Sequence, residues 1–161
     1  MTAKRVFAII ALCLMTVALL TACGDKKVIT PEEFSQKATA DDMQIGDATE
    51  QYAQYDHIVN VTVAKHSDGW QVELLTSKDA ETAIGMYESN KEDFENTGSS
   101  ATEDQTGSAY SQIDVGNSNV YSAERGGKFQ YLCRVDNTLL YANVDMQYKD
   151  AAQDFIKKIG Y

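Results

Sequence analysis

The sequence predicts an α+β fold: one antiparallel sheet of about five or six strands, with helices packed on one of its faces. Several short segments alternate apolar and polar residues, as half-buried strands do. Three other segments space their apolar residues as amphipathic helices do. Two hairpin–helix units can be recognised, and such units fit into one sheet with both helices on the same side.

The first helix has a complete start signal. Thr30 is a capping residue, Pro31 occupies the first helical position, and Glu33 stands where a capping box has its carboxylate. Ile29 and Phe34 occupy the two positions of a hydrophobic staple. We therefore expect a short helix from Pro31 to about residue 40.

The first hairpin follows a segment, residues 43–56, that fits a short strand and then one or two helical turns. Residues 59–64 alternate in the manner of a half-buried strand, and the Asp-Gly dipeptide at 68–69 predicts a tight turn. The return strand directs Leu74 toward the core. A two-residue loop would place Val63 opposite Leu74.

The second helix is expected from residue 78 onward, where the apolar period becomes helical. Gly85 lies in its middle and weakens it by ~1 kcal/mol relative to alanine. Residues 96–108, which hold no aliphatic side chain larger than alanine, predict a solvated loop. The apolar stripe of the helix is Ala80, Ala83, Ile84, Tyr87 and Phe94.

The C-terminal part predicts four more strands and a last helix. Short turns separate the strands, which we place at 110–115, 120–124, 128–135 and 138–144. The helix ends at Gly160, which suits the left-handed position after a helix. One face of the last two strands is assigned to the core, and it carries Phe129, Tyr131, Cys133, Leu140, Ala142 and Val144.

The two hairpin–helix units match at a constant offset of 68 residues. Leu74 falls on Ala142 and Tyr87 on Phe155, and no gap is needed between turn and helix. Two interpretations remain open: a ββα repeat, or coincidence between two amphipathic patterns. In the repeat, both helices would lie on the same face of the sheet.

The N-terminus has the layout of a secretory signal peptide. Residues 6–20 form one apolar run, Lys4 and Arg5 precede it, and small residues follow. As a helix, this run would cover only ~22 Å, less than the ~30 Å hydrocarbon core of a bilayer. A permanent transmembrane helix is therefore not expected.

At the end of this run, Leu20-Thr21-Ala22-Cys23 resembles the lipobox of bacterial lipoproteins. The resemblance implies that residues 1–22 are removed as a signal peptide and that Cys23 becomes a lipid-carrying N-terminus. Residues 23–30 would then form a lipid-anchored tether and residues 31–161 a single α+β domain. A secreted chain that is cut after Ala22 and carries no lipid is the alternative. Two acyl chains suffice for stable anchoring.

The charge of the mature chain restricts its partners. The signal holds two of the 14 basic residues and none of the 24 acidic ones, so the mature chain has a net charge of −12. Nucleic acid is excluded as a partner, because its phosphates require a basic surface. Membrane contact is expected through the lipid anchor rather than the protein surface. The expected location is the outer face of the bacterial cytoplasmic membrane.

No pattern predicts a catalytic residue, a metal ligand set or a cofactor. The two histidines, His57 and His66, have no partners at metal-ligand spacing, and no nucleophile elbow or glycine-rich phosphate loop occurs. Cys133 alternates with apolar residues, which indicates a core position. With Cys13 removed and Cys23 acylated, no partner remains for an intramolecular disulfide.

One apolar patch is a candidate interaction surface. Leu132, Leu139 and Tyr141 fall on the sheet face opposite the assigned core, with Leu132 opposite Tyr141. Either the first helix or residues 43–56 cover them, or they form a docking surface for a protein or a small ligand. Tyr52 and Tyr55 fit packing against the domain or stacking on a sugar ring.

In general style, the body of the chain resembles small surface lipoproteins of Gram-positive bacteria whose roles are unassigned. The sequence therefore predicts a lipid-anchored, extracytoplasmic binding or interaction module without catalytic chemistry. A small envelope-associated enzyme, or an inhibitor of one, is the alternative.

Overall fold

The computed structural model describes residues 25–97 and 109–161. Its α-helices are α2 (Pro31–Thr39), α3 (Ala80–Thr97) and α4 (Lys149–Ile159), and its 3-10 helices are η1 (Thr49–Tyr52) and η3 (Met146–Tyr148). The strands are β1 (Gln44–Asp47), β2 (Ile58–Lys65), β3 (Gln71–Ser77), β4 (Ala109–Val115), β5 (Ser118–Arg125), β6 (Lys128–Val135) and β7 (Thr138–Asp145).

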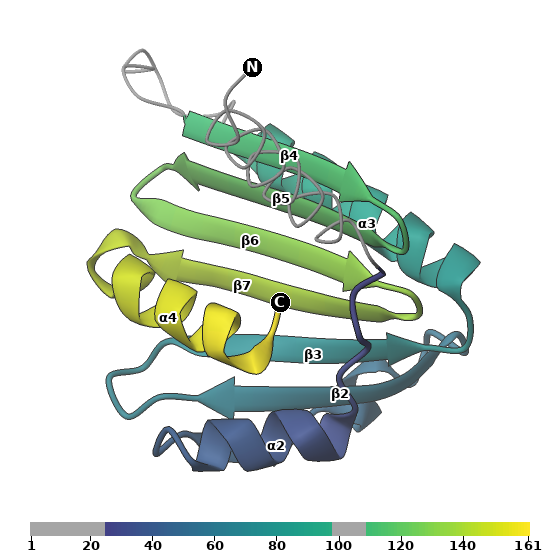
Figure 1. The fold of residues 1–161 in the computed structure, drawn as a ribbon, viewed down its shortest axis with the longest axis horizontal. Coiled ribbons are helices and arrows are strands. Elements are labelled where there is room, and N and C mark those ends of the chain that lie inside the picture. The colour runs from purple at the N-terminus through teal and green to yellow at the C-terminus, as the bar shows by residue number, and fades with distance from the viewer. Residues whose placement is uncertain (1–24, 98–108) are drawn as a thin grey trace, which may run out of the picture.

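The strands form one antiparallel sheet in the order β1-β2-β3-β7-β6-β5-β4 (Figure 1). The predicted α+β class is confirmed. The described part of the chain has seven strands, which corrects the expected five or six. The additional strand is the four-residue β1, which pairs with β2 at the edge of the sheet. It lies within residues 43–56, where a short strand followed by helical turns was expected, and η1 supplies the helical turn.

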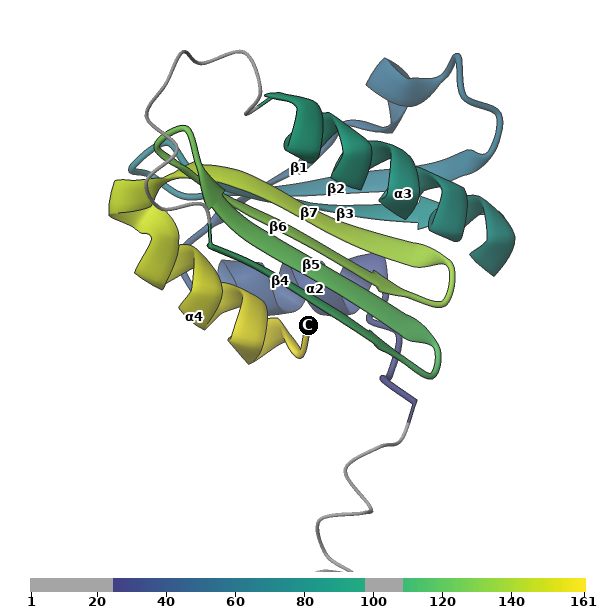
Figure 2. The same cartoon turned by 90° about the horizontal axis from the view of Figure 1, so that it is seen from above.

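The helices lie on both faces of the sheet, which corrects the expectation that they share one face. α2 and α4 lie on one face, and α3 lies on the other (Figure 2). The central strands β6 and β7 bury side chains on both of their faces. Two apolar faces each require a cover, and a single layer of helices would leave one of them in water.

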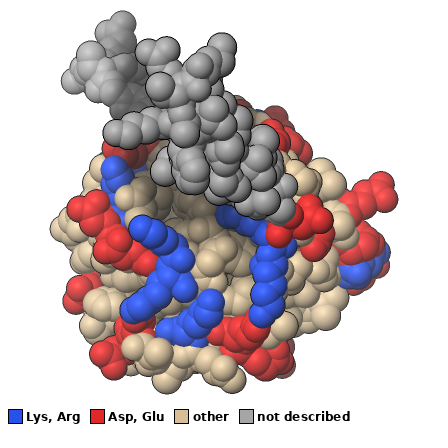
Figure 3. Space-filling view, in the orientation of Figure 1, with Lys and Arg blue, Asp and Glu red and all other residues tan. Residues whose placement is uncertain are grey.

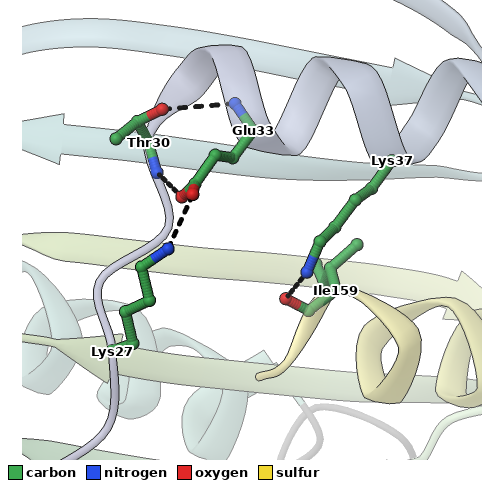
Figure 4. A network of polar contacts seen from close by, with 5 residues as sticks. All are labelled: Lys27, Thr30, Glu33, Lys37 and Ile159. Atoms are coloured by element: carbon green, nitrogen blue, oxygen red, sulfur yellow. Dashed lines mark hydrogen bonds and ion pairs between the residues drawn. The ribbon is translucent and has the colours of Figure 1, made fainter.

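The predicted start of α2 is confirmed in detail (Figure 4). The Glu33 backbone N–H donates to the Thr30 hydroxyl at 3.2 Å, and the Thr30 N–H donates to the Glu33 carboxylate at 3.2 Å. Lys27 donates to the other oxygen of this carboxylate at 2.6 Å. At the far end of the helix, the Lys37 ammonium donates to the Ile159 carbonyl at 2.9 Å and so ties α2 to the last turn of α4.

The β2–β3 hairpin is shifted by one residue from its predicted register. Val63 pairs with Glu73 rather than with Leu74. The loop holds three residues, 67–69, instead of two, and Gly69 adopts a φ of 96° there. Because side chains alternate along a strand, this shift puts Val63 on the α3 face while Leu74 stays in the core under α2 and α4.

The two hairpins meet at the centre of the sheet, where β3 pairs with β7. Val72 lies opposite Ala142, and Leu74 lies opposite Leu140. Under the offset of 68 residues, Val72 corresponds to Leu140 and Leu74 to Ala142, so each of these two pairs corresponds to the other. The strand pairing is therefore compatible with the ββα repeat. The positions of the helices do not fit the repeat, because α3 and α4 lie on opposite faces of the sheet.

The described part of the expected tether packs against the domain. Lys26 donates its backbone N–H to the Asn117 side chain at 2.8 Å, and Asn117 donates to the Lys26 carbonyl at 2.9 Å. The same amide group donates to Asp136 at 2.9 Å. Lys26 therefore lies beside the β4–β5 turn, whose Asn117 also bonds the β6–β7 turn, and Ile29 is buried.

Several sequence expectations lie outside the described residues: the signal peptide 1–22, the lipid site Cys23 and most of the 96–108 loop. Within residues 25–97 and 109–161, no helix combines the length and apolar character needed to span a membrane.

Candidate ligand pocket between α3 and the sheet

The predicted apolar patch is not an exposed surface. Leu132 and Leu139 are 0% and 1% exposed, and they pack beneath α3 in a core cluster. Tyr141 is half-buried at the margin of this cluster. The patch is covered, as one of the two interpretations expected: α3 is the main cover, Ala48 and Tyr52 of residues 43–56 pack in the same cluster, and the first helix lies on the other face. Leu132 and Leu139 cannot serve as a docking surface, which corrects that interpretation.

The buried side of α3 was predicted with one error. Ala83, Tyr87 and Phe94 face the sheet as expected, whereas Ile84 is 45% exposed. Ile84 follows Ala83 by ~100° around the helix, which takes it off the line of contact. The opposite flank of α3, which includes Gly85, faces a pocket.

This pocket has a volume of about 710 Å³, which is in the range of small-molecule sites. Its floor is the sheet, and its two walls are α3 and the segment from η1 to the start of β2. The lining residues are Glu73, Leu75 and Tyr141 from the sheet, Thr82, Gly85, Met86, Ser89 and Asn90 from α3, and Tyr52, Tyr55, His57 and Ile58 from the second wall.

Gly85 explains part of the pocket's space. A Cβ atom at this position would meet nothing within 4 Å, and the residue lies in the interior of an 18-residue helix. Glycine lowers helix stability there and contributes no side chain to packing. Glycine therefore lowers helix stability at a position where a larger side chain would take up space beside the pocket.

We expect the substitution Gly85→Ala to raise the free energy of unfolding by up to about 1 kcal/mol. The added methyl group clashes with nothing, so the gain in helix propensity is not offset by strain. Urea denaturation of the two proteins measures the difference. A loss of stability would show that the position is more crowded than the structure indicates.

Aromatic rings dominate the outer wall. The Tyr52 and Tyr55 ring centroids lie 6.5 Å apart, and the Tyr55 and His57 centroids lie 5.8 Å apart. Tyr55 is 47% exposed at the rim. On the floor, the Tyr141 ring packs against Phe94 with a centroid distance of 5.2 Å, which holds this ring in place.

Glu73 is the only carboxylate among the described residues of the lining, and its hydrogen-bond partners are neutral. Its two oxygens accept hydrogen bonds from the Gln71 amide at 2.8 Å and from the Tyr52 hydroxyl at 3.4 Å. Burial, and then the negative charge of Glu73, raises the pKa of Tyr52 above its ordinary value. Burial likewise raises the pKa of Tyr141. The tyrosine hydroxyls therefore remain neutral donors at physiological pH.

The sequence prediction and the pocket share few residues. Tyr141 is the one member of the predicted patch that lines it, and Tyr52 and Tyr55, expected to pack or to stack on a ligand, form its outer wall. Glu73 and Gly85 were not predicted as site residues. Two signals were available for them: a glutamate between two apolar residues of a strand, and a glycine in the middle of a helix.

Two further expectations concern other residues. Cys133 is buried in the core under α2 and α4, as predicted, and burial raises the pKa of its thiol. Within the described ranges, no group of three or more His, Cys, Asp or Glu side chains is arranged to hold a metal ion.

The fold and the pocket define an α+β domain with an open cavity between its sheet and one helix. No family model and no curated protein matches the chain. Among solved structures, the chain is similar to a GTP binding regulator from Thermotoga maritima, with 16% sequence identity and a TM-score of 0.49. The alignment covers 82% of this chain and 85% of that one.

Proposed function

We propose that this protein is a lipid-anchored binding module on the outer face of the bacterial cytoplasmic membrane, and that it holds a small ligand in the pocket beside α3. The pocket is the observation that carries the proposal. It has the volume of a ligand site, mixes apolar walls with a few polar groups, and is widened by a glycine in the adjoining helix.

The proposed anchor has its support in the sequence and in the segment that follows it. The charged start, the apolar run and the lipobox-like Leu20-Thr21-Ala22-Cys23 favour export and acylation. Cys23 is three residues from Lys26, which is bonded to Asn117. Three residues span at most ~11 Å, so lipid on Cys23 would keep the domain close to the bilayer surface.

The anchor is tested with the substitution Cys23→Ala in the full chain. We expect loss of the lipid mass and release from the membrane fraction, because the thiol that accepts the lipid is absent. Mass spectrometry and fractionation of cells measure both. Cys13→Ala is the matched control, since it lies within the predicted signal and should leave acylation intact. Unchanged mass and fractionation of the Cys23 variant would disprove the anchor.

The pocket is tested separately, on the mature domain, by following amide NMR signals during titration with a set of small polar, apolar and charged compounds. Gly85→Leu should abolish binding, because its side chain enters the free space beside Gly85. Ile84→Leu, an exposed change on the other flank of α3, should not alter it. Binding that is indifferent to Gly85→Leu would place the ligand elsewhere.

Assays on the same purified domain distinguish a binding module from an enzyme. Turnover of a panel of hydrolase substrates that disappears on substitution of one pocket carboxylate would favour an enzyme. Saturable binding without turnover would favour a binding module.

A further inference from the structure

We infer that the pocket beside α3 takes an organic cation of the quaternary ammonium type, whose charge lies against Glu73 and the surrounding tyrosine rings. This inference rests on the proposed function, because it specifies the ligand class of the same pocket. Three observations carry it.

The first observation is the missing counter-charge of Glu73. The residue lies on β3 between Val63 and Tyr141 of the neighbouring strands, and it is partly buried. No ion pair among the described residues includes Glu73, and both of its hydrogen-bond donors are neutral. A carboxylate partly removed from water is stabilised by a cation at short range. Among the described lining residues there is no lysine or arginine, and the one histidine, His57, lies beside Asp56, with Nδ1 3.6 Å from the carboxylate, so a bound ligand is the available source.

The second observation is the set of rings around this charge. Tyr52, Tyr55 and Tyr141 all line the pocket, and Tyr52 contacts Glu73 directly. The face of an aromatic ring carries partial negative charge and attracts cations, and quaternary ammonium groups are recognised by such rings. Leu75 and Met86 add apolar surface that suits the methyl groups of such a ligand.

The third observation is the distribution of charge over the molecule. α3, which forms one wall, carries five acidic residues and one basic residue. On the α2 and α4 face, by contrast, Figure 3 shows basic and acidic side chains side by side. The basic residues of α2 and α4 are balanced by an equal number of acidic ones: Lys37, Lys149, Lys157 and Lys158 against Glu32, Glu33, Asp150 and Asp154. The field beside the pocket therefore favours the approach of cations and disfavours anions.

The test compares choline with the neutral alcohol in which carbon replaces the choline nitrogen, by NMR titration of the mature domain. The two compounds have nearly the same shape, so their difference in affinity isolates the charge. We expect choline to bind roughly tenfold or more tightly, the ratio that corresponds to a cation–π contact reinforced by a carboxylate. Tetramethylammonium should compete with choline.

The substitution Glu73→Gln should remove most of this preference. The amide keeps the shape of the side chain and an oxygen that accepts from Tyr52, but it lacks the charge. We expect choline affinity to fall about tenfold and affinity for the neutral alcohol to stay unchanged. Glu88→Gln is the matched control, since it removes one exposed charge from α3 outside the lining and should change choline affinity less than about twofold.

A second substitution, at Tyr55, tests the same inference if the Glu73→Gln variant does not fold. Tyr55 is exposed at the rim, so its substitution leaves the core intact. Tyr55→Leu should weaken choline binding several-fold, and Tyr55→Phe, which keeps the ring, should retain it.

The outcomes distinguish this inference from the proposed function. Equal binding of choline and its neutral analogue, or binding of a neutral sugar alone, would overturn the cation inference and leave the pocket as a ligand site. Failure of every compound to bind, or binding that survives Gly85→Leu, would overturn the binding function of the pocket itself.

Discussion

The substitution Leu74→Ala is expected to lower the free energy of unfolding by about 2–5 kcal/mol. Leu74 is fully buried, lies opposite Leu140 at the centre of the sheet, and belongs to the core covered by α2 and α4. Truncation removes buried apolar surface and leaves a cavity that rigid neighbours on adjacent strands cannot fill. Equilibrium denaturation in urea measures the loss.

The matched control is Val59→Ala on the adjacent strand, where the side chain is 58% exposed. It should change the free energy of unfolding by less than about 0.5 kcal/mol. A Leu74→Ala effect of similar size to this control would show that the hairpin presents its other face to the core.

Alkaline pH is expected to destabilise the protein strongly between pH 10 and 12. Burial raises the pKa of Tyr161 to about 12, and its hydroxyl shares a 2.6 Å hydrogen bond with the Thr138 hydroxyl. Burial also raises the pKa of Tyr87 and Tyr131. In the unfolded chain these groups ionise near pH 10, whereas in the folded protein they stay protonated. Folding therefore competes with ionisation above pH 10.

The sign follows from proton binding. Above pH 10 the unfolded state binds fewer protons than the folded state, so stability that is fully present below pH 10 decreases as the pH rises. For Tyr161 alone the decrease is about 1.4 kcal/mol per pH unit until its folded-state pKa is reached near 12. Urea denaturation at a series of pH values measures this slope.

Tyrosine-to-phenylalanine variants identify the groups responsible. Tyr161→Phe should remove the contribution of Tyr161 to the decrease of the free energy of unfolding with pH. At neutral pH it should also lower that free energy by about 1 kcal/mol, because the hydrogen bond to Thr138 is lost. Tyr110→Phe, at a residue that is 70% exposed, should leave the slope unchanged. A stability independent of pH from 10 to 12 would contradict the burial of these hydroxyls.

The elements that the sequence predicted best are those whose signals are local. The capping box and proline that start α2 involve residues within four positions of one another, and all of their contacts form as expected. The same holds for α4, which ends with Gly160 in the left-handed conformation, and for the β6–β7 pairing that sets Leu132 opposite Tyr141. These features depend on neighbours along the chain or across one tight turn.

The errors concern the length of one turn and the face covered by one helix, and the local sequence pattern leaves both open. The β2–β3 register depended on whether the loop closed over two or three residues, and both fit the same turn sequence. The number of residues in that loop decides which valines face α3. Likewise, nothing in the local pattern of α3 specifies which face of the sheet it covers.

The sequence by itself determined the fold class, the start of α2, the end of α4, the strand pattern of the second half, and the face of β6 and β7 that forms the core beneath α2 and α4. Only the tertiary structure decided that α3 covers Leu132 and Leu139, and that Glu73, Gly85 and the tyrosines of the second wall surround one cavity. The reason is that periodicity reports which side of an element is apolar, whereas a pocket is defined by the space left between elements distant in sequence.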